Sequence, residues 1–197
     1  LGSAQLVVDG AISTGEGLDF FLESPTFGNG LLYSGRMTFL PLGPMTEEEL
    51  ASEYSIDVTQ KLGLAFGGGY SFNDNAFRSW GSFGDVLTAE RDIQTISIDA
   101  MLRYAGLTVF AEYVRKDIDV PRVFEPGGGS YSYFHEGEGW SAFTSYRGNN
   151  NMLYGLRYAW HRPVSILPLP DSDHAELMLG YLAFDDALRI SLIGDYQ

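Results

Sequence analysis

Single charged residues recur in this sequence within segments that are otherwise apolar, and their chemistry is electrostatic. The ones that we single out are Arg36, Lys61, Asp99, Arg103, Glu112, Arg157, Glu176 and Arg189. Charges of both signs along a narrow aqueous passage bias which ions cross it, because an ion that leaves bulk water needs a compensating field. The same residues can instead brace a sheet as ion pairs: Asp99 and Arg103 share a strand face, and Glu112 follows across a tight turn. Both roles stay open, and they are compatible.

Residues suited to catalysis are few. The histidines are His135, His161 and His174, and the segment "DSDH" at 171–174 is similar to the Asp-His pairs of omptin-like surface proteases. No second acidic pair accompanies it, and no Gly-x-Ser-x-Gly nucleophile motif occurs. The glycines of "AFGGGY" at 65–70 lack the Lys-Ser/Thr of a phosphate-binding loop. We therefore expect no catalytic residues, and a small barrel hydrolase is the least favoured alternative.

Cofactors, metals and nucleic acids are not expected either. The acidic groups at 47–49 and at Glu136 and Glu138 lack the one-three-five spacing of a calcium-binding loop, and the chain has no cysteine for a thiolate site or a disulfide. The 26 Asp and Glu residues outnumber the 12 Lys and Arg residues, which gives a formal net charge of -14. A surface that binds nucleic acid needs basic patches instead.

The elements that must position the charged residues are β-strands. Aromatic residues at 14% and 24 glycines are typical of strands separated by turns, and no run approaches the 18 apolar residues of a transmembrane helix. We expect about ten strands, near 3–12, 17–24, 31–40, 60–72, 94–104, 107–116, 139–147, 152–162, 174–184 and 187–196. Most have about 9 to 12 residues, the length with which a tilted strand crosses a bilayer, whereas strands of soluble proteins have about 5 or 6.

Strict alternation along these segments predicts two faces. The apolar residues expected to face lipid are Ile98, Leu102, Val109, Tyr154, Leu156, Leu179, Ile190 and Leu192, and the eight charged residues would then face a lumen. An arginine at Leu102 should therefore cost far more stability than one at Met101. A β-sandwich or a lipocalin-like barrel with its apolar face turned inward explains the same alternation and stays as an alternative.

The predicted connections fall into two classes. Those at 14–16, 105–106, 147–151 and 184–187 are short, and those at 73–93, 117–138 and 163–173 are long and polar, as at the two rims of an outer-membrane barrel. The segment 41–59 is long where a short turn is due, and a short helix is expected in it with Thr46 as N-cap and Glu49 at the third position. The loop 117–138 is the best candidate for a pore constriction or a contact with a partner.

Five stretches resemble the phosphate-selective porins O and P and their porin relatives, in the family's order. "GRMTFLPLG" (35–43) resembles the Arg-x-x-x-x-Pro-Leu-Gly signature at which a strand ends on the periplasmic side, and "KLGLAFGGGYSF" (61–72) resembles the strand that follows. "ISIDAMLRYAGLTVFAEYVRK" (96–116) resembles the family's Asp-x-x-x-Arg-Tyr-x-Gly-Leu hairpin and is the most specific match. "YGLRYAWHRP" (154–163) and "ELMLGYLAFDDALRISLIGDYQ" (176–197) are similar to the later strands.

This resemblance implies a sixteen-stranded, usually trimeric outer-membrane porin for passive diffusion, of which these residues are expected to form the C-terminal portion. A complete ten-stranded barrel is the alternative. The resemblance also marks a difference from the phosphate-specific members, which line their pores with many Arg and Lys. Here the inward basic residues are matched by Asp9, Asp19, Glu23, Asp99, Glu112, Glu176 and Asp195. A weakly selective or cation-tolerant pore is expected instead of a phosphate-selective one.

The sequence thus predicts a single all-β domain over 1–197, an antiparallel transmembrane β-barrel of the bacterial outer membrane. The expected function is a water-filled channel for ions and small hydrophilic solutes, in contact with lipid and lipopolysaccharide and assembled as a homo-trimer. The alternative is a barrel that acts as a scaffold or sheath for another component, such as a lipoprotein, a secretion complex or an electron-transfer complex.

Overall fold

The chain folds into one antiparallel sheet. The computed structural model describes residues 3–15, 30–51, 61–125, 129–148, 150–164, 170–183 and 188–196. The main sheet has nine strands in the order β1-β2-β3-β4-β5-β8-β9-β10-β11. Their bounds are β1 (Gln5–Thr14), β2 (Leu31–Leu40), β3 (Gly63–Arg78), β4 (Val86–Tyr104), β5 (Leu107–Ile118), β8 (Gly137–Arg147), β9 (Met152–Pro163), β10 (Ser172–Ala183) and β11 (Leu188–Tyr196). The other elements are α1 (Glu47–Ala51) and the small hairpin of β6 (Arg122–Phe124) and β7 (Tyr131–Tyr133).

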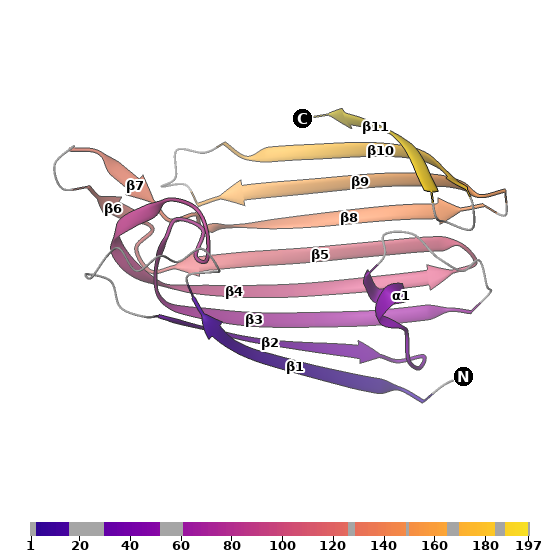
Figure 1. Cartoon of the computed structure of the whole chain (residues 1–197), viewed down its shortest axis with the longest axis horizontal. Helices are drawn as coiled ribbons and strands as arrows, with labels where there is room; N and C mark the ends of the chain where they lie inside the picture. Colours follow the sequence, from indigo (N-terminus) through magenta and orange to yellow (C-terminus); the bar gives the residue numbers. More distant parts are fainter. Residues whose placement is uncertain are drawn as a thin grey trace.

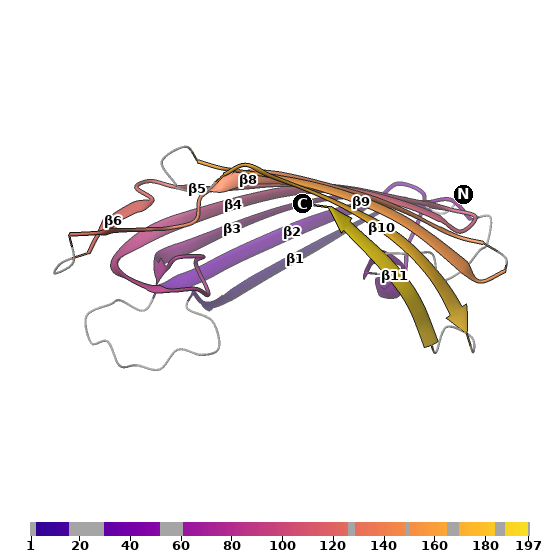
Figure 2. The same cartoon turned by 90° about the horizontal axis from the view of Figure 1, so that it is seen from above.

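The sheet is curved and open (Figures 1 and 2). Strands β1 and β11 lie at its two edges and do not pair with each other in the part of the chain that the structure describes. Helix α1 and the outer ends of β3 and β4 lie on the concave side of the sheet (Figure 2). The all-β, antiparallel prediction is confirmed, whereas a closed barrel is not what the described strands form. No helix among these residues has the length and apolar character needed to cross a membrane.

Nine of the ten predicted strands are confirmed. The exception concerns the connection between β1 and β2. The predicted strand 17–24 lies outside the described residues, but β1 and β2 pair directly, with Thr14 opposite Leu31. The amide of Gly15 donates to the carbonyl of Gly30 over 3.2 Å. Strands β1 and β2 are therefore neighbours in the sheet, and the backbone at Thr14 and Gly15 still follows the β1–β2 pairing.

The connections gather at two ends of the sheet, which we call the turn end and the loop end. The turn end carries the tight turn of Ala105 and Gly106, whose φ angles of 49° and 86° suit a two-residue hairpin, and the turn at 148–151. The loop end carries the connections that follow β1, β3, β5 and β9. The expected loop 73–93 is instead largely strand, because β3 and β4 continue past an irregularity near Asn73 and Ala76.

The two faces of the sheet follow the predicted alternation. On β4, the side chains of Ile96 and Ile98 are 47% and 57% exposed on the convex face, while Met101 and Arg103 are buried on the concave face. The register carries this alternation across the sheet, with Ile98 opposite Gly68 on one side and opposite Tyr113 on the other. The described apolar side chains at the predicted lipid-facing positions lie on the convex face; those of Ile190 and Leu192 lie outside the described part.

Two small hydrophobic clusters form on the concave face. At the loop end, Ala76, Leu87, Ile93, Ile118, Val123 and Phe134 pack together where the ends of β3 and β4 meet the β6–β7 hairpin. At the turn end, Met45 and Leu50 pack on Leu40, Ala65 and Met101. Met101 is 6% exposed, so an arginine there would also disrupt a packed cluster, and Met101 is not the tolerant position that the alternation predicts.

Helix α1 forms as predicted. The amide of Glu49 donates to Oγ1 of Thr46 over 3.1 Å, and the amide of Thr46 donates to Oε2 of Glu49 over 2.7 Å. This reciprocal pair is a capping box, which satisfies two amide donors at the start of the helix. It holds residues 41–51, which we call the helix cover, in a compact form on the concave face.

Candidate functional site

The concave face carries a band of charged residues half-way between the two ends, which we call the charge belt: Arg36, Asp99, Glu112, Arg157 and Glu176. In it, Nη2 of Arg36 lies 2.7 Å from Oδ2 of Asp99. The pair reaches across the whole of β3, since the register sets Arg36 opposite Gly69 and Asp99 opposite Gly67. A Cβ on Gly67 would collide with both side chains, so the glycine is what leaves the ion pair room.

The belt continues across the other half of the sheet. Glu112 lies opposite Asp99 on β5, and its side chain makes no hydrogen bond or ion pair with any residue that the structure describes. Arg157 on β9 lies 3.6 Å from Glu176 on β10. The belt therefore contains two basic and three acidic side chains from five strands, and Asp9 on β1, opposite Arg36 in the register, adds a further acidic residue at the edge of the sheet.

The other three predicted site residues lie apart from the belt. Arg103 is 5% exposed at the turn end, where its Nε lies 3.4 Å from the sulfur of Met101. Lys61 is exposed and precedes β3. Arg189 pairs by register with Leu182 on β10, and its side chain lies outside the described part. The sequence predicted the face of these residues but not that the helix cover lies close to Arg103, because that depends on how residues 41–51 fold back.

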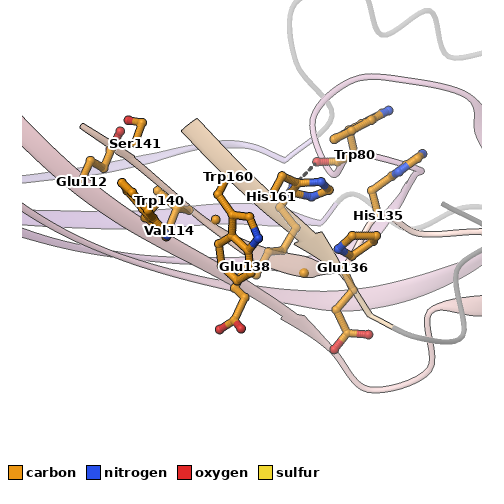
Figure 3. A pocket seen from close by; sticks show the side chains of 14 residues that line it. Trp80, Glu112, Val114, His135, Glu136, Glu138, Trp140, Ser141, Trp160 and His161 are labelled. Atoms are coloured by element: carbon orange, nitrogen blue, oxygen red, sulfur yellow. Dashed lines mark hydrogen bonds between the residues drawn. The ribbon is translucent and has the colours of Figure 1, made fainter. Parts of the chain in front are cut away.

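A second feature of the concave face is a cavity of about 310 Å³ at the loop end, which we call the mouth cavity. Its lining includes Trp80, Glu112, Lys116, His135, Ser141 and His161. Figure 3 shows Trp80 and His135 on one side of it and Glu112 and Ser141 on the other, with His161 between.

Trp80 contacts His135, Phe83 and Lys116 and so holds one wall of this cavity together. The His135 ring stacks on it with centroids 3.8 Å apart and planes 8° apart, and Phe83 stacks at 5.8 Å. The ammonium of Lys116 donates to the Trp80 carbonyl over 3.0 Å and lies 5.8 Å from the ring centroid. The amide of His135 donates to the carbonyl of Ser79 over 2.7 Å, which ties the two loop segments together. Trp80 still remains 41% exposed.

Burial alters the ionisation of two groups in this loop. It lowers the pKa of His135 below its ordinary value, and the nearby Lys116 ammonium lowers the pKa further. Burial raises the pKa of Glu136, against the opposing effect of the hydrogen bond from the Ile118 amide. In both groups the shift is toward the neutral form. Sequence reasoning did not single out Trp80, Lys116 or Ser141, although an aromatic residue in the polar "RSWGSFGD" segment is a usable signal.

The convex face is apolar over its middle and aromatic toward its ends. Exposed aromatic residues near the turn end are Phe39, Phe66, Tyr104, Tyr146, Tyr154 and Tyr181, and those toward the loop end are Tyr33, Tyr70, Trp140 and Tyr158. Beyond the latter the face becomes polar: Arg115 pairs with Asp117 at 2.7 Å, and the Tyr113 hydroxyl donates to Glu138 over 2.6 Å. The convex face thus has an apolar middle, aromatic residues toward both ends and polar residues beyond them.

The "DSDH" segment does not assemble a catalytic pair. The Asp173 carboxylate accepts a hydrogen bond from the Tyr158 hydroxyl over 2.6 Å. Since Asp173 and His174 are successive residues of β10, their side chains point to opposite faces of the sheet.

Comparison with protein-family models, with curated proteins and with solved structures finds no match.

Proposed function

We propose that this chain forms the wall of an outer-membrane β-barrel porin that passes ions and small hydrophilic solutes by diffusion. The observation that carries the proposal is the continuous apolar surface on the convex face of the sheet. Soluble monomers rarely expose apolar patches larger than a few hundred Å², yet side chains such as Val8, Ile98 and Leu177 are 57–65% exposed there on widely separated strands.

The height of this surface suits a bilayer. On the convex side of β4, the polar Gln94 lies toward the loop end and the aromatic Tyr104 at the turn end, ten residues apart. At about 3.3 Å per residue they span roughly 33 Å of strand, which is about 25 Å of height at a tilt of about 40°. The apolar band of outer-membrane barrels is about 25 Å tall.

The concave face has the character of a lumen. In the proposed channel the charge belt would present both signs half-way along the passage. The helix cover and the β3–β4 end cover parts of the concave face at opposite ends of the sheet and would narrow it there. The lipocalin-like alternative needs the apolar face to turn inward, whereas the belt and the charged Lys116 occupy that side. With three acidic and two basic side chains in the belt, a slight preference for cations is expected.

The proposal requires the sheet to close. Unpaired backbone groups at the edges of β1 and β11 would each cost several kcal/mol inside a bilayer. Further strands must therefore complete the barrel, as the resemblance to phosphate-selective porins O and P implies with its sixteen strands and trimeric assembly. Lipid and lipopolysaccharide would contact the convex face.

Single-channel conductance of the purified full-length protein in a planar bilayer, with the reversal potential in a salt gradient, tests the function. Steady openings with a small cation preference are expected. Glu112→Lys should shift the reversal potential toward anions, because it changes the belt by two charges. Asp119→Lys makes the same change in an exposed connection outside the belt and should have a much smaller effect.

The absence of channel openings in recordings from correctly folded protein would refute the open channel. It would favour the scaffold or sheath alternative, in which another component fills the lumen.

A further inference from the structure

The mouth cavity has walls of unlike chemistry, which limits what it can bind. One wall is the flat stack of Trp80 and His135, held in place by Lys116. The facing wall carries Glu112 and Ser141 on neighbouring strands, opposite each other in the register. An apolar wall facing a few polar groups is the usual composition of a small-molecule site.

The polar groups of the cavity are available to a ligand. The side chains of Glu112, Ser141 and His161 make no hydrogen bond or ion pair with the residues that the structure describes. Together they offer a carboxylate that accepts, a hydroxyl that donates and accepts, and an imidazole that does both. They come from β5, β8 and β9, so the sheet itself holds them at fixed spacing.

The charge balance of the cavity disfavours strong anions and cations. Its only ammonium among the described residues, that of Lys116, already donates to the Trp80 carbonyl. The carboxylate of Glu112 would repel a phosphate, and the Lys116 ammonium would oppose a cation. A neutral ligand with many hydroxyls, one face of which is formed by C–H groups, matches both walls.

We propose that the mouth cavity is a binding site for a neutral pyranose sugar, which deepens the proposed function by naming the solute class that the channel retains at its loop end. The polarised C–H groups of one sugar face would lie against the exposed part of the Trp80–His135 stack. The hydroxyls at the opposite edge would bond to Glu112, Ser141 and His161. The volume of about 310 Å³ is at the small end of ligand sites, which suits one sugar ring.

Binding is tested on the refolded full-length protein in detergent, by calorimetry and by quenching of tryptophan fluorescence. The probes are glucose and maltose, with inorganic phosphate as the charged competitor. We expect millimolar sugar binding that Trp80→Ala and Glu112→Ala each weaken at least tenfold. Tyr131→Ala is the matched control. Tyr131 is a 46% exposed aromatic residue of the β6–β7 hairpin at the same end of the sheet, and it does not line the cavity. The control variant should change affinity less than twofold.

The outcomes separate this site from the channel. The site would be overturned, even if the protein conducts ions, by the absence of binding of either sugar at a concentration 100-fold above the expected dissociation constant. Equal losses of sugar affinity in Trp80→Ala and Tyr131→Ala would also overturn it. Preferred binding of phosphate would overturn it as well. Binding that depends on Trp80 in a protein that never conducts would leave the site standing and refute the porin. Heat-modifiable migration of each variant on gels shows that it is folded.

Discussion

The lipid-facing role of the convex face is tested most directly at Ile98. This side chain is 57% exposed on the convex face of β4, about half-way between Gln94 and Tyr104. If lipid covers the face, Ile98→Arg puts a charge near the bilayer midplane and should cost about 2–4 kcal/mol of the free energy of unfolding. If water covers it, the substitution of an exposed residue should cost no more than about 0.5 kcal/mol.

The adjacent residue provides the matched control. Ser97 points to the concave face, where its strand neighbours are Gly69 and Val114. The glycine leaves space, and the nearby belt carboxylates of Asp99 and Glu112 favour a cation. Ser97→Arg should therefore cost less than about 1 kcal/mol although it makes the same chemical change one residue away.

The assay is reversible urea unfolding of the full-length protein in phospholipid vesicles, followed by tryptophan fluorescence. The wild type, Ile98→Arg and Ser97→Arg are compared at equal lipid content. A difference of at least 2 kcal/mol between the two variants is expected. Equal costs, or a negligible cost at Ile98, would refute the assignment of the convex face to lipid.

Three further outcomes follow from the concave side. Gly67→Val, whose side chain would collide with the belt ion pair, should destabilise the fold by about 1–3 kcal/mol, whereas Gly68→Val on the convex face should not, as urea unfolding can measure. Thr46→Ala removes the N-cap of α1 and should cost that helix about 1 kcal/mol, seen as faster hydrogen exchange in residues 47–51; unchanged exchange would contradict the role of the capping box. His135 has a lowered pKa in the folded state, so the unfolded chain binds the proton more readily and stability falls as the pH decreases below about 6.5. Tryptophan fluorescence should report this loosening as the pH falls below about 6.5, and His135→Gln should abolish the change.

Local pattern predicted much of the fold. The strands after 31–40 appear within three residues of their expected bounds, except that β3 ends six residues later and β4 begins eight residues earlier than expected. The helix at 47–51 follows from Thr46 and Glu49 alone. The prediction failed at residues 73–93, where the local sequence favours a loop but long-range packing favours strands. The Asn, Asp and Gly residues of 73–93 are typical of a loop, yet β3 and β4 continue through them because Ala76 and Leu87 find a hydrophobic partner in the β6–β7 hairpin.

The candidate site was predicted less completely. The pairing of Arg36 with Asp99 joins residues 63 positions apart across an intervening strand, and only the register reveals it. The mouth cavity likewise depends on Trp80 and His135 meeting from two separate connections. No spacing in the sequence specifies such contacts.

By itself, the sequence determined which side chains share a face, because successive side chains of a strand point to opposite sides and this period is local. It also determined the tight turn at Ala105 and Gly106 and the cap of α1. Only the tertiary structure decided which face is concave, that β1 and β2 pair directly, and that Met45 and Leu50 cover the turn end. Those features depend on sheet curvature and on packing between residues distant in the chain, and neither is contained in any one segment.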